Sequence, residues 1–362
     1  MIEHAYIHIP FCLRKCKYCD FVSGKDINNK EIYIKTLLSE IKSCYKNDVL
    51  KTLYFGGGTP SLLEPNDIKL IFDCFNLEKD AEVTLEANPE TVELERFIEY
   101  RKVGINRISL GVQSFNNDLL QLIGRNHSEQ TILSAIETIK KAGFKNISID
   151  LIYGLPNQTI KDFKFDLKKA MSLDIQHIST YGLKIEENSF FGKNPPNNLP
   201  DDGQQAEMFL CLCKFLKENN FEHYEISNFA KKYYFSRHNY AYWRNKEYYG
   251  FGLNASGYIE NVRYKNTSSF EEYINNPTQK EEKDFIAKEE KLENEIFLAL
   301  RLQEGINIED INAKYNIDFE KKYKKIIEKY SQLNLLEIVH NHCKLTEKGI
   351  LLSNDIMSEF LD

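Results

Sequence analysis

The sequence predicts an α/β protein, built as a partial (β/α)6 barrel similar to a TIM barrel and followed by a small C-terminal domain. In the first half of the chain, six short apolar runs rich in strand-forming residues alternate with segments of helical spacing. The runs are 5–9, 52–55, 82–86, 107–111, 146–152 and 177–181. One segment between them places Ile132, Ile136 and Ile139 on a single helical face and ends at Gly143, a residue type that often closes helices. This alternation is typical of βαβ units around a parallel sheet.

The positions of polar residues distinguish a barrel from an open doubly wound sheet. Glycines and polar side chains stand at or just after the ends of nearly every predicted strand: 56–59, Glu86, Gln113, Asp150 and Tyr181. In an open sheet the reactive groups gather at one crevice, whereas in a barrel they come from the carboxyl ends of several strands. The distribution therefore favours the barrel, of which six units are recognisable.

From about residue 290 the pattern changes to short helices and a two-stranded wing. Helices are expected over 308–315, 319–333 and 347–361, and strand-like alternation over 335–345. This order is typical of a winged-helix-like α+β module. The predicted domains are thus a barrel over 1–230, an aromatic-rich connecting segment over 231–289 and the winged-helix-like domain over 290–362.

The charge of the chain excludes several classes of protein. The 362 residues include 47 Lys and Arg against 54 Asp and Glu, a net charge of −7, so binding by broad neutralisation of phosphates is excluded. The C-terminal domain lacks the basic face of a DNA reader, apart from the short cluster 321–325, and no nucleic acid is expected as a partner. The most apolar stretch, 208–216, contains Lys214 and is far shorter than the roughly 20 residues of a membrane span. Without a signal-like N-terminus, we expect a cytoplasmic protein with reduced cysteines.

Three of the eight cysteines, Cys12, Cys16 and Cys19, lie close together just after the first predicted strand. Thiolates are soft ligands that suit zinc and iron–sulfur clusters. A structural zinc site needs four ligands, so His4 or His8 would have to complete it. A cubane cluster held by three thiolates instead leaves one iron open to a small molecule. The spacing favours the iron–sulfur cluster.

The segment Cys12-Leu13-Arg14-Lys15-Cys16-Lys17-Tyr18-Cys19 resembles the signature of the radical S-adenosylmethionine (SAM) superfamily. Other motifs look like those of the family that contains the oxygen-independent coproporphyrinogen dehydrogenase and HemW. They are Tyr6-Ile7-His8-Ile9-Pro10-Phe11-Cys12, Tyr54-Phe55-Gly56-Gly57-Gly58-Thr59-Pro60-Ser61, Glu86-Ala87-Asn88-Pro89, Leu110-Gly111-Val112-Gln113-Ser114-Phe115, Gly124-Arg125, Asp150-Leu151-Ile152-Tyr153-Gly154-Leu155-Pro156 and Tyr224-Glu225-Ile226-Ser227-Asn228-Phe229-Ala230. The resemblance covers most of the chain, in the order expected for a radical SAM barrel.

The resemblance implies a [4Fe–4S] cluster whose open iron binds SAM and, when reduced, cleaves it to a 5′-deoxyadenosyl radical. The cluster ligands carried over are Cys12, Cys16 and Cys19. The SAM-binding residues carried over are Tyr6, Tyr18, Gly57, Gly58, Thr59, Glu86, Gln113, Arg125 and Asp150, with Gly57 and Gly58 at the SAM amino group. Taken alone, each polar residue has an alternative role to SAM binding, such as a hydrogen bond at the end of a strand. Each tyrosine, taken alone, could serve only to pack against its neighbours. Their joint occurrence favours the SAM site.

Two functions remain within this family. The dehydrogenase has a further cysteine two positions after the third cluster cysteine, where this chain has Phe21, so the sequence is more similar to HemW, a heme chaperone. The segment His238-Asn239-Tyr240-Ala241-Tyr242-Trp243 matches the HemW motif and makes His238 a candidate heme ligand, although a hydrogen-bonded structural role is favoured for it. Ser256 replaces a histidine that the family usually has, which weakens the transfer of substrate-site detail.

The resemblance therefore predicts a heme chaperone that binds a [4Fe–4S] cluster, SAM and heme, and that delivers heme to apoproteins. Membrane-associated respiratory proteins are candidate recipients, and a reductant protein of unknown identity would supply electrons. SAM cleavage is expected, while an enzymatic role is left open because Phe21 stands in place of the dehydrogenase-type cysteine. The alternatives are oxidative decarboxylation of coproporphyrinogen III and a zinc-stabilised scaffold without SAM chemistry.

Overall fold

Seven parallel strands form the centre of the first of the two units into which the computed structural model divides. Residues 1–24 and 27–361 are described. The first unit comprises Met1–Phe209 and Glu247–Asp284, and the second comprises Leu210–Lys246 and the chain from Phe285 onward. The three-part division at residues 230 and 289 stays a prediction.

The strands of the first unit follow one another in the order β6-β5-β4-β3-β2-β1-β9. They are β1 (His4–Ile9), β2 (Val49–Gly57), β3 (Asn76–Ala87), β4 (Arg107–Gln113), β5 (Asn146–Tyr153), β6 (His177–Gly182) and β9 (Tyr249–Phe251). Each adjacent pair is parallel. Because β1 to β6 are neighbours in chain order, the strand order never reverses as it does in a doubly wound sheet. The α/β partial barrel predicted from the sequence is therefore confirmed.

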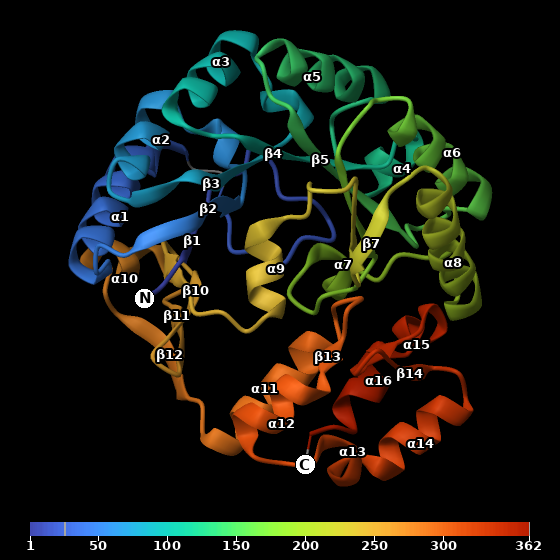
Figure 1. Ribbon diagram of the computed structural model, residues 1–362. Coiled ribbons are helices and arrows are strands. Elements are labelled where there is room, and N and C mark those ends of the chain that lie inside the picture. The colour runs from blue at the N-terminus through green and yellow to red at the C-terminus, as the bar shows by residue number, and fades with distance from the viewer. Residues whose placement is uncertain (25–26, 362) are drawn as a thin grey trace. The chain divides into compact units, whose positions relative to one another are not determined.

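Helices follow these strands. They are α1 (Lys30–Cys44), α2 (Pro65–Phe72), α3 (Leu94–Val103), α4 (Asn117–Leu122), α5 (Glu129–Lys141), α6 (Ile160–Met171) and α7 (Phe190–Lys193), and α8 (Asp202–Glu218) continues into the second unit. Of these, α1, α2, α3, α5 and α6 lie on the outside of the strands (Figure 1), whereas α7 lies against the loop that follows β1. The apolar face expected around Ile132 and Ile136 is buried on α5, which Ser128 caps. All seven residues of β4 are buried, as expected for a strand covered on both faces.

A buried carboxylate on α1 fixes the segment that follows β9. This segment comprises β10 (Ser256–Ile259), β11 (Val262–Asn266), α10 (Phe270–Asn275) and β12 (Lys280–Phe285). The Glu40 side chain is fully buried and accepts hydrogen bonds from the Gly252 N–H at 2.8 Å, the Tyr273 hydroxyl at 2.7 Å and the Asn266 amide at 2.8 Å. Lys280 Nζ lies 3.2 Å from Oε1 of the same carboxylate. Every oxygen of this buried charge is thus paired.

The second unit contains a hairpin, a set of short helices and a small antiparallel sheet. Its elements are β7 (Glu222–Glu225), β8 (Asn228–Ala230), α9 (Arg237–Trp243), α11 (Lys288–Ala299), β13 (Ile306–Asn307), α12 (Ile308–Tyr315), α13 (Phe319–Lys322), α14 (Lys324–Gln332), β14 (Leu336–Val339), β15 (His342–Leu345), α15 (Glu347–Leu351) and α16 (Ser353–Ser358). The helix expected over 319–333 is divided at Tyr323, because its ring is buried beside Phe319 and Phe360, with centroids 5.0 and 5.1 Å away. The helix expected over 347–361 is divided at Leu352.

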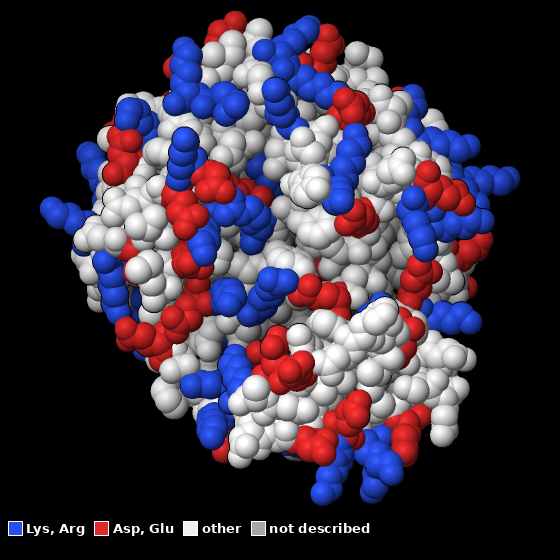
Figure 2. All heavy atoms as spheres, in the orientation of Figure 1, with Lys and Arg blue, Asp and Glu red and all other residues white. Residues whose placement is uncertain are grey.

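Positive and negative side chains are interspersed over the face shown in Figure 2. That pattern differs from the continuous basic surface that a DNA reader presents. Within residues 1–24 and 27–361, no helix combines the length and the apolar character needed to cross a membrane.

Candidate functional site

The cysteine loop, residues 12–24, follows β1 and is closed at its base by backbone hydrogen bonds. The Cys12 N–H donates to the Gly24 carbonyl at 3.0 Å, and the Gly24 N–H donates to the Pro10 carbonyl at 2.7 Å. In its middle, the Lys17 N–H donates to the Ile123 carbonyl at 3.0 Å, and the Lys17 carbonyl accepts from Phe191 N–H at 2.9 Å. The loop is therefore fixed at its ends and at its centre.

The three thiols of this loop are partly exposed. Burial raises the pKa of Cys16, an effect that the Arg125 guanidinium opposes, and burial also raises the pKa of Cys19. Metal binding would therefore release thiol protons here. The only sulfur donors of this partly open loop are cysteine thiols. Such a ligand set suits an iron–sulfur cluster.

A single metal ion is a poorer fit to this loop than a cluster. In the described part of the chain, no three His, Cys, Asp or Glu side chains converge as the ligands of one ion. The two histidines considered for zinc are hydrogen-bonded elsewhere, His4 to the Thr52 hydroxyl at 2.9 Å and His8 to the Val22 carbonyl at 3.0 Å. In a cubane cluster each thiolate binds a different iron, so its ligands stand further apart than those of one zinc ion. The residues present therefore fit the cluster better.

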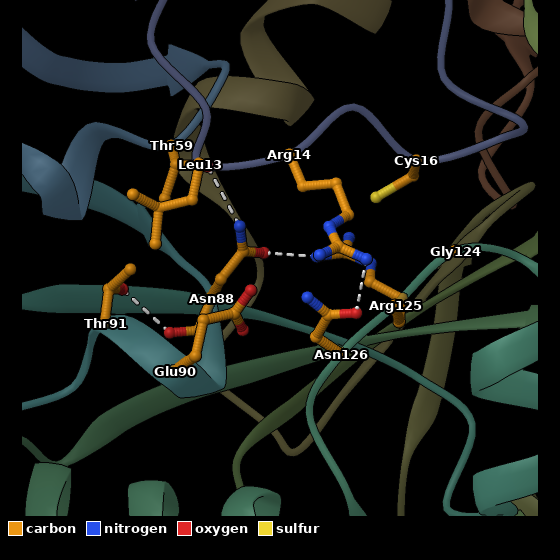
Figure 3. Close-up of a pocket in the computed structure, with 10 residues that line it drawn as sticks. All are labelled: Leu13, Arg14, Cys16, Thr59, Asn88, Glu90, Thr91, Gly124, Arg125 and Asn126. Carbon is orange, nitrogen blue, oxygen red and sulfur yellow. Dashed lines mark hydrogen bonds between the residues drawn. The ribbon is translucent and has the colours of Figure 1, made fainter. Parts of the chain in front are cut away.

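A chain of hydrogen bonds leads from the first cysteine to the arginine of the site, and Figure 3 shows its part from Thr59 through Asn88 to Arg125. The Thr59 hydroxyl donates to Cys12 Sγ at 3.5 Å, and the Asn88 amide donates to the Thr59 oxygen at 2.9 Å. Arg125 then donates to Asn88 Oδ1 at 2.6 Å and to the Tyr18 hydroxyl at 2.9 Å. Cys16, Thr59, Asn88 and Arg125 line one pocket. The sequence motif contained Asn88, but its role in joining Thr59 to Arg125 was not predicted.

The glycine run at the end of β2 allows close approach of other groups. Gly57 has φ +106°, and a Cβ there would lie 2.5 Å from the His8 ring. A Cβ on Gly58 would lie 2.6 Å from the Phe11 carbonyl oxygen. Both positions thus require glycine, one for conformation and both for space. The backbone of the run consequently lies directly against β1 and the start of the cysteine loop.

Two carboxylates, Glu86 at the end of β3 and Asp150 on β5, belong to the same site. The Tyr54 hydroxyl and the Gly57 N–H donate to Glu86 at 2.8 and 3.1 Å, and the Ser109 hydroxyl donates to Asp150 at 3.1 Å. Burial raises the pKa of Glu86 to about 7 and also raises the pKa of Asp150. Tyr6 belongs to this group, since a Cβ on Gly56 would lie 2.9 Å from the rings of both Tyr6 and Tyr54 and 3.1 Å from Glu86 Oε1. Burial, and next to it the Glu86 charge, raises the pKa of Tyr6.

Arg107, at the start of β4, is a buried cation that sequence reasoning missed. Its side chain is 1% exposed, and its positive charge opposes the rise in pKa at Glu86 and Asp150. An arginine at the first position of a strand is usually a solvated residue, so nothing in the local pattern indicated this role. The cation compensates part of the negative charge that the two carboxylates place inside the barrel.

Gln113 lies beside Arg125 and Asn88, and Gly111 leaves room for all three. A Cβ on Gly111 would lie 3.1 Å from Asn88 Oδ1 and 3.3 Å from both Arg125 Nη2 and Gln113 Nε2. The first unit therefore brings together the predicted cluster ligands and the predicted SAM residues: Tyr6, Cys12, Cys16, Tyr18, Cys19, Gly57, Gly58, Thr59, Glu86, Gln113, Arg125 and Asp150.

His238 belongs to the second unit, on α9. Its ring is 1% exposed, and its Nε2 is 2.8 Å from the Tyr242 hydroxyl. One face of the neighbouring Trp243 ring is covered by the Arg301 guanidinium, 4.6 Å from the ring centroid. In this conformation the imidazole has a hydrogen-bond partner and one face of the indole is covered.

Comparisons with known proteins match both units. The model of the radical SAM superfamily matches residues 6–170, and that of the HemN C-terminal domain matches residues 286–352. The heme chaperone HemW of Lactococcus lactis subsp. lactis is 38% identical over 99% of this chain and 97% of its own length. HemW of Bacillus subtilis is 34% identical over 99% of both chains.

A solved structure of coproporphyrinogen III oxidase (HemN) from Escherichia coli, described as a radical SAM enzyme, has the same fold. Its TM-score is 0.87 over 99% of this chain and 90% of that chain, at 22% identity. At that identity the likeness establishes the fold alone. The full-length similarity to HemW proteins, at more than a third of positions, agrees with the motifs around Cys12 and His238. The chain belongs to the HemW family of the radical SAM superfamily.

Proposed function

We propose that this protein is a heme chaperone, which binds heme, holds a [4Fe–4S] cluster with SAM and delivers the heme to apoproteins. The full-length similarity to HemW heme chaperones is the observation that supports it most strongly. Phe21 adds support, because this residue, 60% exposed, provides no thiol at the position of the dehydrogenase-type cysteine. The wild-type protein should therefore bind heme without converting coproporphyrinogen III.

In this proposal Cys12, Cys16 and Cys19 would hold the cluster, which would supply an open iron for SAM and, when reduced, the electron for SAM cleavage. The chain's own groups bind and orient SAM around it. The backbone of Gly57 and Gly58, which packs against His8 and Phe11, is proposed to lie at the amino group. Arg125 is suited to a carboxylate because guanidinium pairs with it in two hydrogen bonds. Glu86 and Asp150 are acceptors for ammonium or ribose hydroxyl groups. The remaining residues proposed at SAM are Tyr6, Tyr18, Thr59 and Gln113.

SAM affinity should depend on the ionisation of Glu86. The groups facing this carboxyl are the Tyr6 and Tyr54 hydroxyls, Asp150 and Arg107. With a pKa of about 7 in the free protein, Glu86 is largely neutral below that pH and ionised above it. Because an ionised carboxylate binds cationic SAM better, the affinity should rise from about pH 6 to about pH 7.5.

Anaerobic calorimetry of SAM binding across this range would measure the effect. Glu86→Gln should bind SAM more weakly and lose most of the pH dependence, while any titration of SAM itself would persist in the variant. An equal pH dependence in both proteins would contradict the role given to Glu86.

His238 is a candidate axial ligand of heme, the alternative to the structural role that its hydrogen bond to Tyr242 supports, and that bond would have to open for Nε2 to reach iron. His238→Ala should therefore weaken heme binding and alter the Soret band, which reports axial ligation. Tyr242→Phe is the matched control, since it removes the competing hydroxyl and keeps both the ring and His238. This variant should bind heme at least as well as the wild type. An unchanged Soret band in His238→Ala would show that another residue is the axial ligand of heme.

The decisive test compares heme binding and porphyrinogen turnover on one anaerobically reconstituted sample. A saturable Soret shift without formation of protoporphyrinogen supports the chaperone. Formation of protoporphyrinogen from coproporphyrinogen III with SAM and reductant would support the dehydrogenase instead. Iron and sulfide analysis of the same sample tests the zinc-stabilised scaffold, which would contain neither.

We further propose that the protein acts in the cytoplasm, with heme-receiving apoproteins as partners and membrane-associated respiratory proteins as candidate recipients. None of the eight cysteines, all within the described residues, forms a disulfide, as expected in a reducing compartment. Transfer of heme from the loaded protein to a candidate apoprotein, followed by the change in the Soret band, would identify a recipient.

A further inference from the structure

Gln113 has an unusual backbone conformation for the last residue of a strand. Its φ is +64°, in the left-handed region that few non-glycine residues adopt. The pairing of β4 with β5 shifts register between Gly111 and Gln113, which marks a bulge. Bulges near functional sites commonly redirect a side chain. Gln113 is 6% exposed, and its Oε1 has no hydrogen-bond partner among the described residues.

Asp166 on α6 holds the two residues that follow Gln113. The Ser114 hydroxyl donates to Asp166 Oδ2 at 2.9 Å and lies 3.1 Å from Oδ1. The Phe115 N–H donates to Oδ1 at 2.7 Å. The Ser114 oxygen in turn accepts from the Asn116 N–H at 3.0 Å. One carboxylate on a neighbouring helix thus fixes the turn directly after the strained residue.

The burial of this carboxylate is costly. Asp166 is fully buried, and burial raises its pKa to about 7, although the bonds from Phe115 and Ser114 oppose that rise. If a buried acid only filled space, an apolar side chain could take its place without loss of stability. The carboxylate instead offsets the cost of the left-handed conformation at Gln113, because a strained residue persists only where its surroundings fix it.

We propose that Asp166 is a positioning residue for SAM, acting through Gln113. By holding Ser114 and Phe115, it keeps the Gln113 amide beside Arg125 and Asn88, with the unpaired Oε1 available to the ligand. This role rests on the proposed binding of SAM in the first unit. It assigns to α6 a part in a site whose other residues lie on or just after the strands, in the cysteine loop and, for Arg125, between α4 and α5.

The test measures SAM affinity in cluster-loaded protein, from the change that SAM causes in the electron paramagnetic resonance spectrum of the reduced cluster. Asp166→Asn keeps the shape of the side chain but replaces one acceptor oxygen with a donor NH2 and removes the charge, so one neutral oxygen is left to accept from both Ser114 and Phe115 and both bonds become weaker. It should weaken SAM binding about tenfold while iron and sulfide content stay at the wild-type level. Ser114→Ala removes one donor only, and a smaller loss of affinity is expected; it also carries the test should Asp166→Asn fail to fold.

Two controls separate positioning from stability. Asp162→Asn removes a carboxylate that caps the first turn of the same helix, so it should lower thermal stability and leave SAM affinity unchanged. In a Gln113→Ala background, Asp166→Asn should cause little further loss of affinity, because the residue through which it acts is gone.

Wild-type affinity in cluster-loaded Asp166→Asn or Ser114→Ala would overturn the inference and leave the proposed function intact. An equally large effect of Asp166→Asn with and without Gln113 would overturn it too, since the effect would then not pass through Gln113. If the wild-type cluster failed to respond to SAM at all, the proposed SAM site itself would fail, and the role of Asp166 with it.

Discussion

Replacing Cys12, Cys16 or Cys19 with alanine should abolish cluster assembly completely. The three thiols are the only sulfur donors in the cysteine loop, and two thiolates leave a second iron of a cubane without a protein ligand. Each variant should still fold, because the ends of the loop are held by backbone hydrogen bonds that no side chain provides. Iron and sulfide analysis after anaerobic reconstitution, with thermal unfolding of the same samples, measures both expectations.

Cys44→Ala is the matched control, since this half-buried thiol ends α1 and lies outside the cysteine loop. It should load iron and sulfide as the wild type does. A brown chromophore retained by any of the three loop variants would show that the ligands are misassigned. Zinc in place of iron in the wild type would instead favour the scaffold alternative.

Glu40→Ala should cause the largest loss of stability of any single substitution considered for this protein. The change removes a fully buried carboxylate and leaves the Lys280 ammonium, 11% exposed, without its anion. It also strands the donors of Gly252, Asn266 and Tyr273. Breaking a buried ion pair from one side costs about 3–5 kcal/mol. Urea unfolding at neutral pH would measure the change in the free energy of unfolding.

Two comparisons sharpen this prediction. Glu31→Ala, an exposed acid in the first turn of the same helix, should cost no more than about 1 kcal/mol. Glu40→Leu combined with Lys280→Met should recover part of the loss, because the pair is then replaced rather than broken. A loss below about 1 kcal/mol for Glu40→Ala would contradict the assignment of the network as the anchor of the segment after β9.

The barrel could be predicted from the sequence because apolar residues recur with one period in strands and with another in helices. All six expected strands are present, and each is longer than the predicted run, by one residue in β1, β5 and β6 and by more in β2, β3 and β4, since apolar periodicity locates the centre of a strand better than its ends. The helix expected over 319–333 was wrong in one respect, its continuity. A break that depends on the burial of the Tyr323 ring is a tertiary effect and leaves no local signal.

Motifs located the candidate site, but they did not reveal what holds it in place. Glycines and cysteines carry a spacing that can be recognised in the sequence, whereas a single charged residue inside a strand or helix does not. Arg107, Asp166 and Glu40 each occur where a solvated charge would be expected, and only the packing of distant elements buries them. Asn88 stood within a motif, yet its link between Thr59 and Arg125 required coordinates.

The closed base of the cysteine loop has a consequence for how the protein matures. Bringing the three ligands together has a cost in conformational entropy. Most of this cost is met when the polypeptide folds, because the hydrogen bonds joining Cys12, Gly24 and Pro10 close the loop. Metal incorporation can then follow folding instead of driving it, unlike in a zinc finger, where the apo peptide is unfolded. We therefore expect the cluster to be loaded into a chain that has already folded, and a cluster lost to oxygen to be restored by iron and sulfide without refolding.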